Sequence, residues 1–172
     1  GRSAPVQLSM RRDIARAIRS FRPDALVVSP WDVEFAIGLN QADHRVARLA
    51  AVDAMRDAGN RWVFPELVAE GLEPHSTRWL LTNGLENGMH GVDVSGEPLE
   101  RGIASLEAHA EYLAAIPGHP APRAMISAFT AMQGEAMGVA NAVLFRAWDS
   151  QARPAIMEEL QVAEEEAAAK AG

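Results

Sequence analysis

Apolar residues recur with a helical period near the start of the chain. Four of them stand at positions i, i+3, i+4 and i+7: Ile14, Ala17, Ile18 and Phe21. Most arginines of the segment fall elsewhere, so the pattern predicts an amphipathic helix with one packed and one solvated face, and Ser9 is a candidate N-cap. The next apolar run, Ala-Leu-Val-Val-Ser at positions 25–29, is typical of a central parallel strand covered on both faces.

A second helix is predicted to start near Asn40, with Asp43 three residues later as in a capping box. It is expected to run to about Ala58, where Gly59 and Asn60 stop it. At about 100° per residue, His44 falls on the same side as the small and apolar positions of this helix. The imidazole is therefore expected to face inward at the edge of the sheet.

The remaining pattern predicts three short strands and then helices. The strands are expected at 61–64, 77–82 and 91–94, an amphipathic helix at 99–113, and a second long helix from near Pro122 towards Trp148. Gly134 and Gly138 would loosen that helix or allow close packing. We divide the chain into a linker or cloning remnant at 1–8, one α/β domain at 9–150, and a charged, solvated helical tail at 151–172.

Composition narrows the possible chemistry. The chain has 172 residues, 48% of them hydrophobic, which suits one domain with a buried core. A net charge of −7 disfavours nucleic-acid binding, and no apolar run approaches membrane-spanning length. There is no cysteine, so a metal site would have to use histidine and carboxylate ligands. The sequence predicts a soluble, cytoplasmic protein without nucleic-acid or membrane partners.

The strongest candidate for chemistry is the pair Asp43-His44, at a loop-to-helix junction after a buried strand. Ligands and metals collect at this place in α/β folds. Taken alone, His44 is more often a hydrogen-bonded core or capping residue, and Asp43 more often a helix cap. Four further residues are candidates for substrate contacts, although packing explains Trp31 and His109 as well: Trp31, Asp32, Asn40 and His109.

The run Asn-Gln-Ala-Asp-His-Arg at 40–45, followed by an alanine-rich helix and Phe-Pro-Glu-Leu at 64–67, resembles the second metal-site motif of the LmbE/PIG-L family. These proteins are zinc-dependent N-acetylglucosaminyl de-N-acetylases and related amidases. Arg-Pro-Asp at 22–24, Glu-Pro-His at 73–75 and Glu-Ala-His at 107–109 stand in the family's order. The resemblance covers positions 11–148 and implies a Rossmann-like, three-layer α/β fold that lacks the family's first strands, with helices at its C-terminal end.

The resemblance assigns roles to three residues. It implies that His44 binds Zn²⁺ or another divalent metal and that Asp43 orients it. Gln41 stands where the family commonly has a histidine that helps stabilise the tetrahedral oxyanion; its amide donates a hydrogen bond but supplies no charge. The implied reaction is removal of an N-acetyl or other acyl group from an amino sugar or related amide by metal-activated water.

One family motif has no counterpart in this chain. The family's His-Pro-Asp-Asp-Glu run supplies two further metal ligands and the catalytic base, and nothing here matches it. The resemblance therefore implies that the N-terminal part of the same protein or a second chain supplies these groups, or that the chain is a non-catalytic binding or assembly module. A missing first strand would expose a sheet edge, so we also expect a homo- or hetero-oligomer.

Overall fold

The computed structural model describes residues 3–35, 38–83 and 88–152. Six helices lie within them: α1 (Ser3–Phe21), α2 (Ala42–Ala58), α3 (Pro65–Ala69), α4 (Glu97–Glu107), α5 (Ala110–Ala115) and α6 (Pro122–Met137). Six strands accompany them: β1 (Ala25–Val28), β2 (Glu34–Phe35), β3 (Gly38–Leu39), β4 (Trp79–Asn83), β5 (His90–Asp93) and β6 (Ala142–Asp149). The predicted tail lies outside the described residues from position 153 onward.

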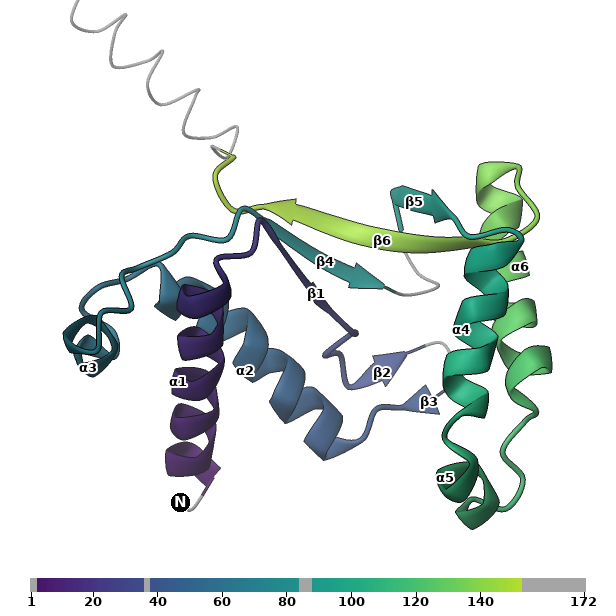
Figure 1. Ribbon diagram of the computed structural model, residues 1–172, viewed down its shortest axis with the longest axis horizontal. Coiled ribbons are helices and arrows are strands. Elements are labelled where there is room, and N and C mark those ends of the chain that lie inside the picture. Colours follow the sequence, from purple (N-terminus) through teal and green to yellow (C-terminus); the bar gives the residue numbers. More distant parts are fainter. Residues whose placement is uncertain (1–2, 36–37, 84–87, 153–172) are drawn as a thin grey trace, which may run out of the picture.

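Four strands form one mixed sheet in the order β1-β4-β6-β5 (Figure 1). β1 and β4 are parallel, with Val27 opposite Leu81, whereas β6 is antiparallel to both β4 and β5. β2 and β3 make a separate two-stranded hairpin between β1 and α2. The predicted α/β class, a sheet flanked by helices, is confirmed.

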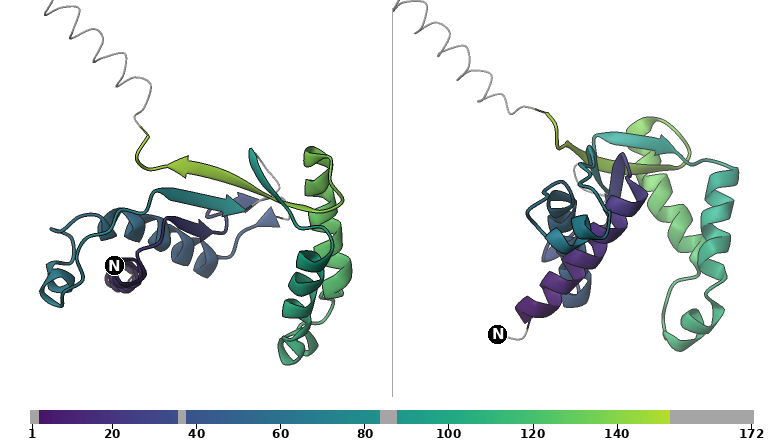
Figure 2. Two further views of the ribbon diagram at one scale, coloured as in Figure 1. Left: turned by 45° about the horizontal axis from the view of Figure 1, so that its top comes forward. Right: turned by 60° about the vertical axis from the view of Figure 1, so that its left-hand side comes forward.

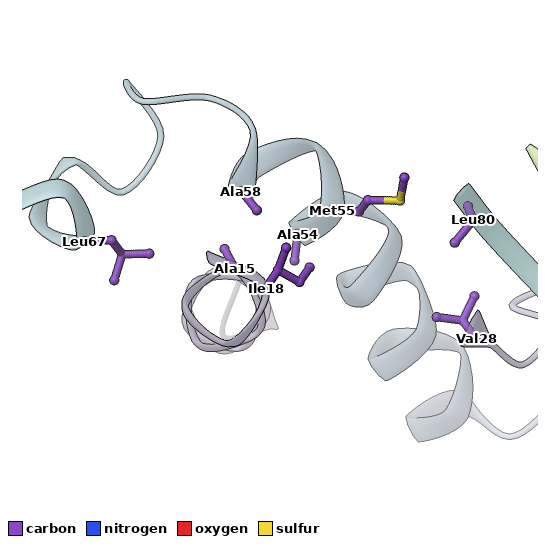
Figure 3. Packing of buried hydrophobic residues seen from close by; sticks show 8 residues of the cluster. All are labelled: Ala15, Ile18, Val28, Ala54, Met55, Ala58, Leu67 and Leu80. Carbon is purple, nitrogen blue, oxygen red and sulfur yellow. The ribbon is translucent and has the colours of Figure 1, made fainter. Parts of the chain in front are cut away.

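The core forms where α1 and α2 cross beneath the sheet (Figure 3). Ala15 of α1 and Ala54 and Ala58 of α2 are fully buried, and side chains this small let the two helix backbones come close together. Val28 and Leu80 extend the cluster from the sheet. Both helices lie on the same side of the strands in Figures 1 and 2, so this contact fixes where α2 begins relative to the sheet.

The strand predicted at 25–29 is present as β1, but it is not a central strand with both faces covered. β1 pairs with β4 alone among the described strands, and it therefore forms an edge of the sheet. Val27 is 58% exposed, whereas Val28 is buried. The apolar run suggested cover on both faces, but in the described residues only one face of β1 is packed.

Two predicted elements in the first half differ in the structure. α1 begins at Ser3, so Ser9 lies inside the helix and is not its N-cap. Residues 61–64 are a turn rather than a strand, with the Val63 amide donating to the Asn60 carbonyl. Phe64 has a left-handed backbone (φ 55°) and leads directly into α3, whose first residue is Pro65. A proline at this position starts a helix readily because it needs no amide partner there.

The predicted helix at 99–113 is broken. α4 ends at Glu107, and His109 is the N-cap residue of the separate helix α5.

Within the described residues, no helix is both long enough and apolar enough to cross a membrane.

The long helix predicted from Pro122 towards Trp148 is wrong in its second half. α6 ends at Met137, and Gly138 adopts a left-handed backbone (φ 69°) that closes the helix. β6 follows from Ala142 and packs under α6, where the Gln133 side chain accepts a hydrogen bond from the Leu144 amide at 2.7 Å. Gly134 permits this reversal, because a Cβ there would lie 2.6 Å from the Val139 carbonyl oxygen.

We expect Gly134→Ala to destabilise the fold by about 1–3 kcal/mol, since the added methyl meets main-chain atoms that cannot rotate away. Urea denaturation followed by circular dichroism measures the change. Gly102→Ala in α4 is the matched control: nothing lies within 4 Å of its Cβ position, so it should stabilise by about 0.5–1 kcal/mol. Equal effects of the two substitutions would contradict the packing described for α6.

Candidate functional site

Except for His109, the candidate residues follow the carboxyl end of strand β1, which is parallel to β4. The chain leaves β1 at Val28, passes through the β2–β3 hairpin and enters α2 at Ala42. Gln41 is the N-cap residue of α2, and Asp43 and His44 belong to its first turn. This is the position that the sequence predicted for the pair, and the carboxyl ends of parallel strands are where α/β sheets bind ligands.

His44 does not face the core as expected. It is exposed, as are Gln41 and Asp43, and the buried residues of α2 begin only at Ala50. The first turns of α2 therefore extend beyond its contact with α1. The helical period predicts a buried His44 only if neighbouring elements pack along the whole length of α2. In the structure the buried residues lie in the second half of the helix.

Asn40 has a different role from the predicted cap. Gln41 is the N-cap, without a side-chain hydrogen bond, so no capping box forms. Asn40 is only 3% exposed, and its amide nitrogen donates to the carbonyl oxygens of Pro30 and Asp32, both at 3.0 Å. Its amide oxygen accepts from Arg48 at 3.2 Å. Asn40 thus fastens the loop after β1 to the start of α2.

Sequence reasoning missed the part that Arg48 plays. Its guanidinium donates to the Pro30 carbonyl oxygen at 2.7 Å as well as to Asn40. The guanidinium of Arg45 donates to the main-chain oxygen of Asn40. One available signal was spacing, because Arg48 stands one helical turn after His44.

We expect Asn40→Ala to destabilise the fold by about 1–3 kcal/mol, because it removes the amide donor of the Asp32 carbonyl oxygen and one of the two hydrogen bonds of both Pro30 and Arg48. Thermal unfolding of the variant measures this. Asn83→Ala at the exposed end of β4 is the control and should shift the free energy of unfolding by less than about 0.5 kcal/mol. A wild-type melting curve for Asn40→Ala would contradict the fastening role.

Trp31 packs on its own domain. Its ring lies 5.7 Å from the Trp148 ring, tilted by 38°, and it rests against the buried cluster of α1 and α2. The guanidinium carbon of Arg146 lies 4.4 Å from the centre of the Trp148 ring on β6. Asp32 is exposed beside this stack. These contacts explain the position of Trp31 by packing, which was one of the two roles considered for it from the sequence.

His109 is bound to its own helical segment. The residue is exposed, and its Nδ1 lies 2.9 Å from the Ser105 carbonyl oxygen one turn earlier. Figure 1 places α5 at the end of the α4–α6 pair that is remote from the sheet. The contact with Ser105 accounts for its position without a substrate.

A catalytic zinc site usually takes three protein ligands and leaves a position for water. Across residues 3–35, 38–83 and 88–152, no group of three histidine, cysteine, aspartate or glutamate side chains is placed to hold a metal ion. The described residues therefore do not fit a complete zinc site. What they offer at the start of α2 is one exposed imidazole, that of His44, which follows the exposed Asp43 in the sequence.

Comparison with known proteins gives a fold but no family. No family model and no curated protein matches the chain. Among solved structures, N,N'-diacetylchitobiose deacetylase from Pyrococcus horikoshii, complexed with its inhibitor, matches with a TM-score of 0.69 and 16% identity, covering 83% of this chain and 52% of that one. A conserved protein from Thermus thermophilus matches with a TM-score of 0.63 and 20% identity, covering 85% and 63%.

These likenesses show a shared fold. The chain spans about half of the deacetylase and 63% of the Thermus protein. The α/β arrangement around the sheet is therefore one that solved structures share over about half to two thirds of their own length.

Proposed function

We propose that this chain belongs to a metal-dependent hydrolase that removes an acyl group, in the simplest case N-acetyl, from the nitrogen of an amino sugar or related amide. The observation that carries the proposal is the position of Asp43 and His44. They occupy the first turn of the helix after β1, at the ligand-binding end of a sheet whose fold is shared with a deacetylase.

In this proposal each residue has a limited task. His44, exposed on the first turn of α2, would give one imidazole nitrogen to Zn²⁺ or another divalent metal. Successive helical side chains diverge by about 100°, so Asp43 would act on His44 mainly as a nearby negative charge that favours a bound cation. Gln41 would donate one amide hydrogen bond to the acyl carbonyl oxygen.

The remaining ligands would come from polypeptide outside the described residues, either another part of the same protein or a partner chain. Among the described strands β1 has only β4 as a neighbour, so the main-chain groups of its other edge are free to pair with a further strand. A parallel strand added there would end beside the carboxyl end of β1. Its last residues would then lie on the same side of the sheet as His44.

A non-catalytic role is the second candidate. The neutral Gln41 and the absence of a three-ligand group in the described ranges favour a scaffold that binds or assembles without turnover. Such a module would retain the fold and would not require a metal.

Release of a free amine separates the two candidates. The protein, expressed from its complete reading frame together with any partner that co-purifies, is incubated with N,N'-diacetylchitobiose or N-acetylglucosamine. We expect amine release that stops when a chelator is added. A folded, metal-loaded preparation that releases no amine from either sugar would favour the binding module.

A further inference from the structure

One face of the four-stranded sheet carries buried side chains, and the opposite face does not. Strand alternation and the strand register place Val28, Leu80, Thr82 and Leu144 on one face, and all four are buried. We call the opposite face the outer face. It carries these side chains: Ala25, Val27, Trp79, Leu81, Asn83, His90, Val92, Val143, Phe145, Ala147 and Asp149.

None of the side chains of the outer face is buried. Val27 is 58% exposed and Val92 is 55% exposed, with the partly exposed Leu81 and Phe145 between them. In Figures 1 and 2, α1 and α2 both lie against the other face. An apolar sheet face of this kind ordinarily packs against a second layer of structure, because leaving it in water is costly.

The chain leaves the sheet at the margin of this face. After β6, the Ser150 amide donates to the Arg78 carbonyl oxygen at 2.8 Å, and the Ser150 hydroxyl donates to the Thr77 carbonyl oxygen at 2.8 Å. These bonds hold the end of β6 beside the start of β4. Residues 153–172 follow directly from there.

The sequence of this segment suits a covering helix. Four apolar residues recur at i, i+4, i+7 and i+11: Ile156, Leu160, Ala163 and Ala167. At about 100° per residue they share one face, and Glu158 and Glu165 fall on the opposite one. A helix over 154–170 would be about 25 Å long, and the eight residues of β6 span about 26 Å.

We propose that residues 154–170 form an amphipathic helix that folds back over the outer face, with Ile156 and Leu160 against Leu81, Phe145 and Ala147. This proposal differs from the solvated tail expected from the sequence. A tethered segment has a high effective concentration at the face, whereas a second copy with the same net charge of −7 would be repelled. The helix covers the face and leaves the free edge of β1 open, so the proposal does not depend on the proposed function.

Disulfide formation tests the placement, because residues 1–172 contain no cysteine that would interfere. In the full-length protein, Ala147→Cys is combined with Leu160→Cys, or with Val162→Cys as the matched control. Val162 lies about 200° around the helix from Leu160 and faces away from the sheet. Under mild oxidation we expect a monomeric, internally linked product at least tenfold more abundant for the Leu160 pair.

Three results would overturn the proposal. Equal linkage in the two pairs would mean that the tail has no fixed face, and no linkage in either would mean that it does not lie on the sheet. Linked dimers as the main product would assign the face to a second copy. As an independent measurement without cysteines, Leu160→Asp should raise the fluorescence of a hydrophobic dye several-fold, and Val162→Asp should leave it unchanged.

Discussion

Arg19→Ala is expected to unfold at a temperature roughly 6–12 °C lower than the wild type, corresponding to a loss of about 3 kcal/mol in the free energy of unfolding. Arg19 is 2% exposed, although the helical pattern suggested a solvated arginine. Its guanidinium donates to the carbonyl oxygens of Ala58 at 3.1 Å, Asn60 at 2.9 Å and Val63 at 3.0 Å. These oxygens belong to the end of α2 and the turn after it.

The size of this effect follows from what the substitution leaves behind. Burial lowers the pKa of Arg19, but an arginine stays protonated at neutral pH, and its charge is favourable at a helix C-terminus. Removing it takes a charged donor away from several carbonyl oxygens at the end of α2, although the oxygens of Ala58 and Asn60 keep the amides of His75 and Val63 as partners. Arg19→Lys should recover part of the loss, because a single ammonium cannot reach all of them.

Calorimetry or urea denaturation of Arg19→Ala, Arg19→Lys and Arg12→Ala measures these differences. Arg12 is partly exposed on the same helix and pairs with its neighbour Asp13 at 3.2 Å, so its loss should cost less than about 0.5 kcal/mol. If Arg19→Ala and Arg12→Ala unfold at the same temperature, Arg19 does not hold the end of α2.

His44→Ala is expected to reduce amine release from an N-acetylated amino sugar by at least about 100-fold, because it removes a proposed metal ligand. His44 is exposed, so the free energy of unfolding should change by less than about 0.5 kcal/mol. The separation of activity from stability distinguishes a site residue from a structural one. Initial rates and melting curves of the same preparations provide both measurements.

Two variants frame this prediction. Asp43→Asn removes the neighbouring charge but keeps the ligand, and we expect a smaller loss of roughly 10-fold to 100-fold. His119→Ala is the control, since His119 is half-buried in the loop before α6, where its Nδ1 lies 2.7 Å from the adjacent Pro120 carbonyl oxygen and its ring lies against Tyr112. If His44→Ala retains wild-type turnover, His44 has no part in catalysis.

An element was predicted well where its sequence had both a periodic apolar pattern and a residue that ends a helix. α2 runs from Ala42 to Ala58 as expected, because its small residues repeat helically and Gly59 follows. The failure came at β6, whose residues are apolar on both faces, so periodicity could not separate a strand from a buried helix. Gly138 was the available stop signal, and the structure uses it as the C-cap.

The place of the candidate site could be predicted, whereas its orientation could not. The position of His44 at the start of α2 follows from the local sequence. Its exposure depends on how far α1 overlaps α2, which is a tertiary property. Asn40 shows the same limit, because its hydrogen bonds to Pro30 and Asp32 depend on the path of the loop, and the local pattern suggested only a cap.

Metal content tests most directly the central claim that His44 is one ligand of a site completed by other polypeptide. The full-length protein, with any co-purifying partner, is dialysed against a zinc solution beside the His44→Ala and His119→Ala variants. The zinc bound to each is then measured by inductively coupled plasma mass spectrometry. The account predicts about one equivalent of metal in the wild type and His119→Ala, and at least a tenfold loss in His44→Ala. Equal metal content in the wild type and His44→Ala would contradict it.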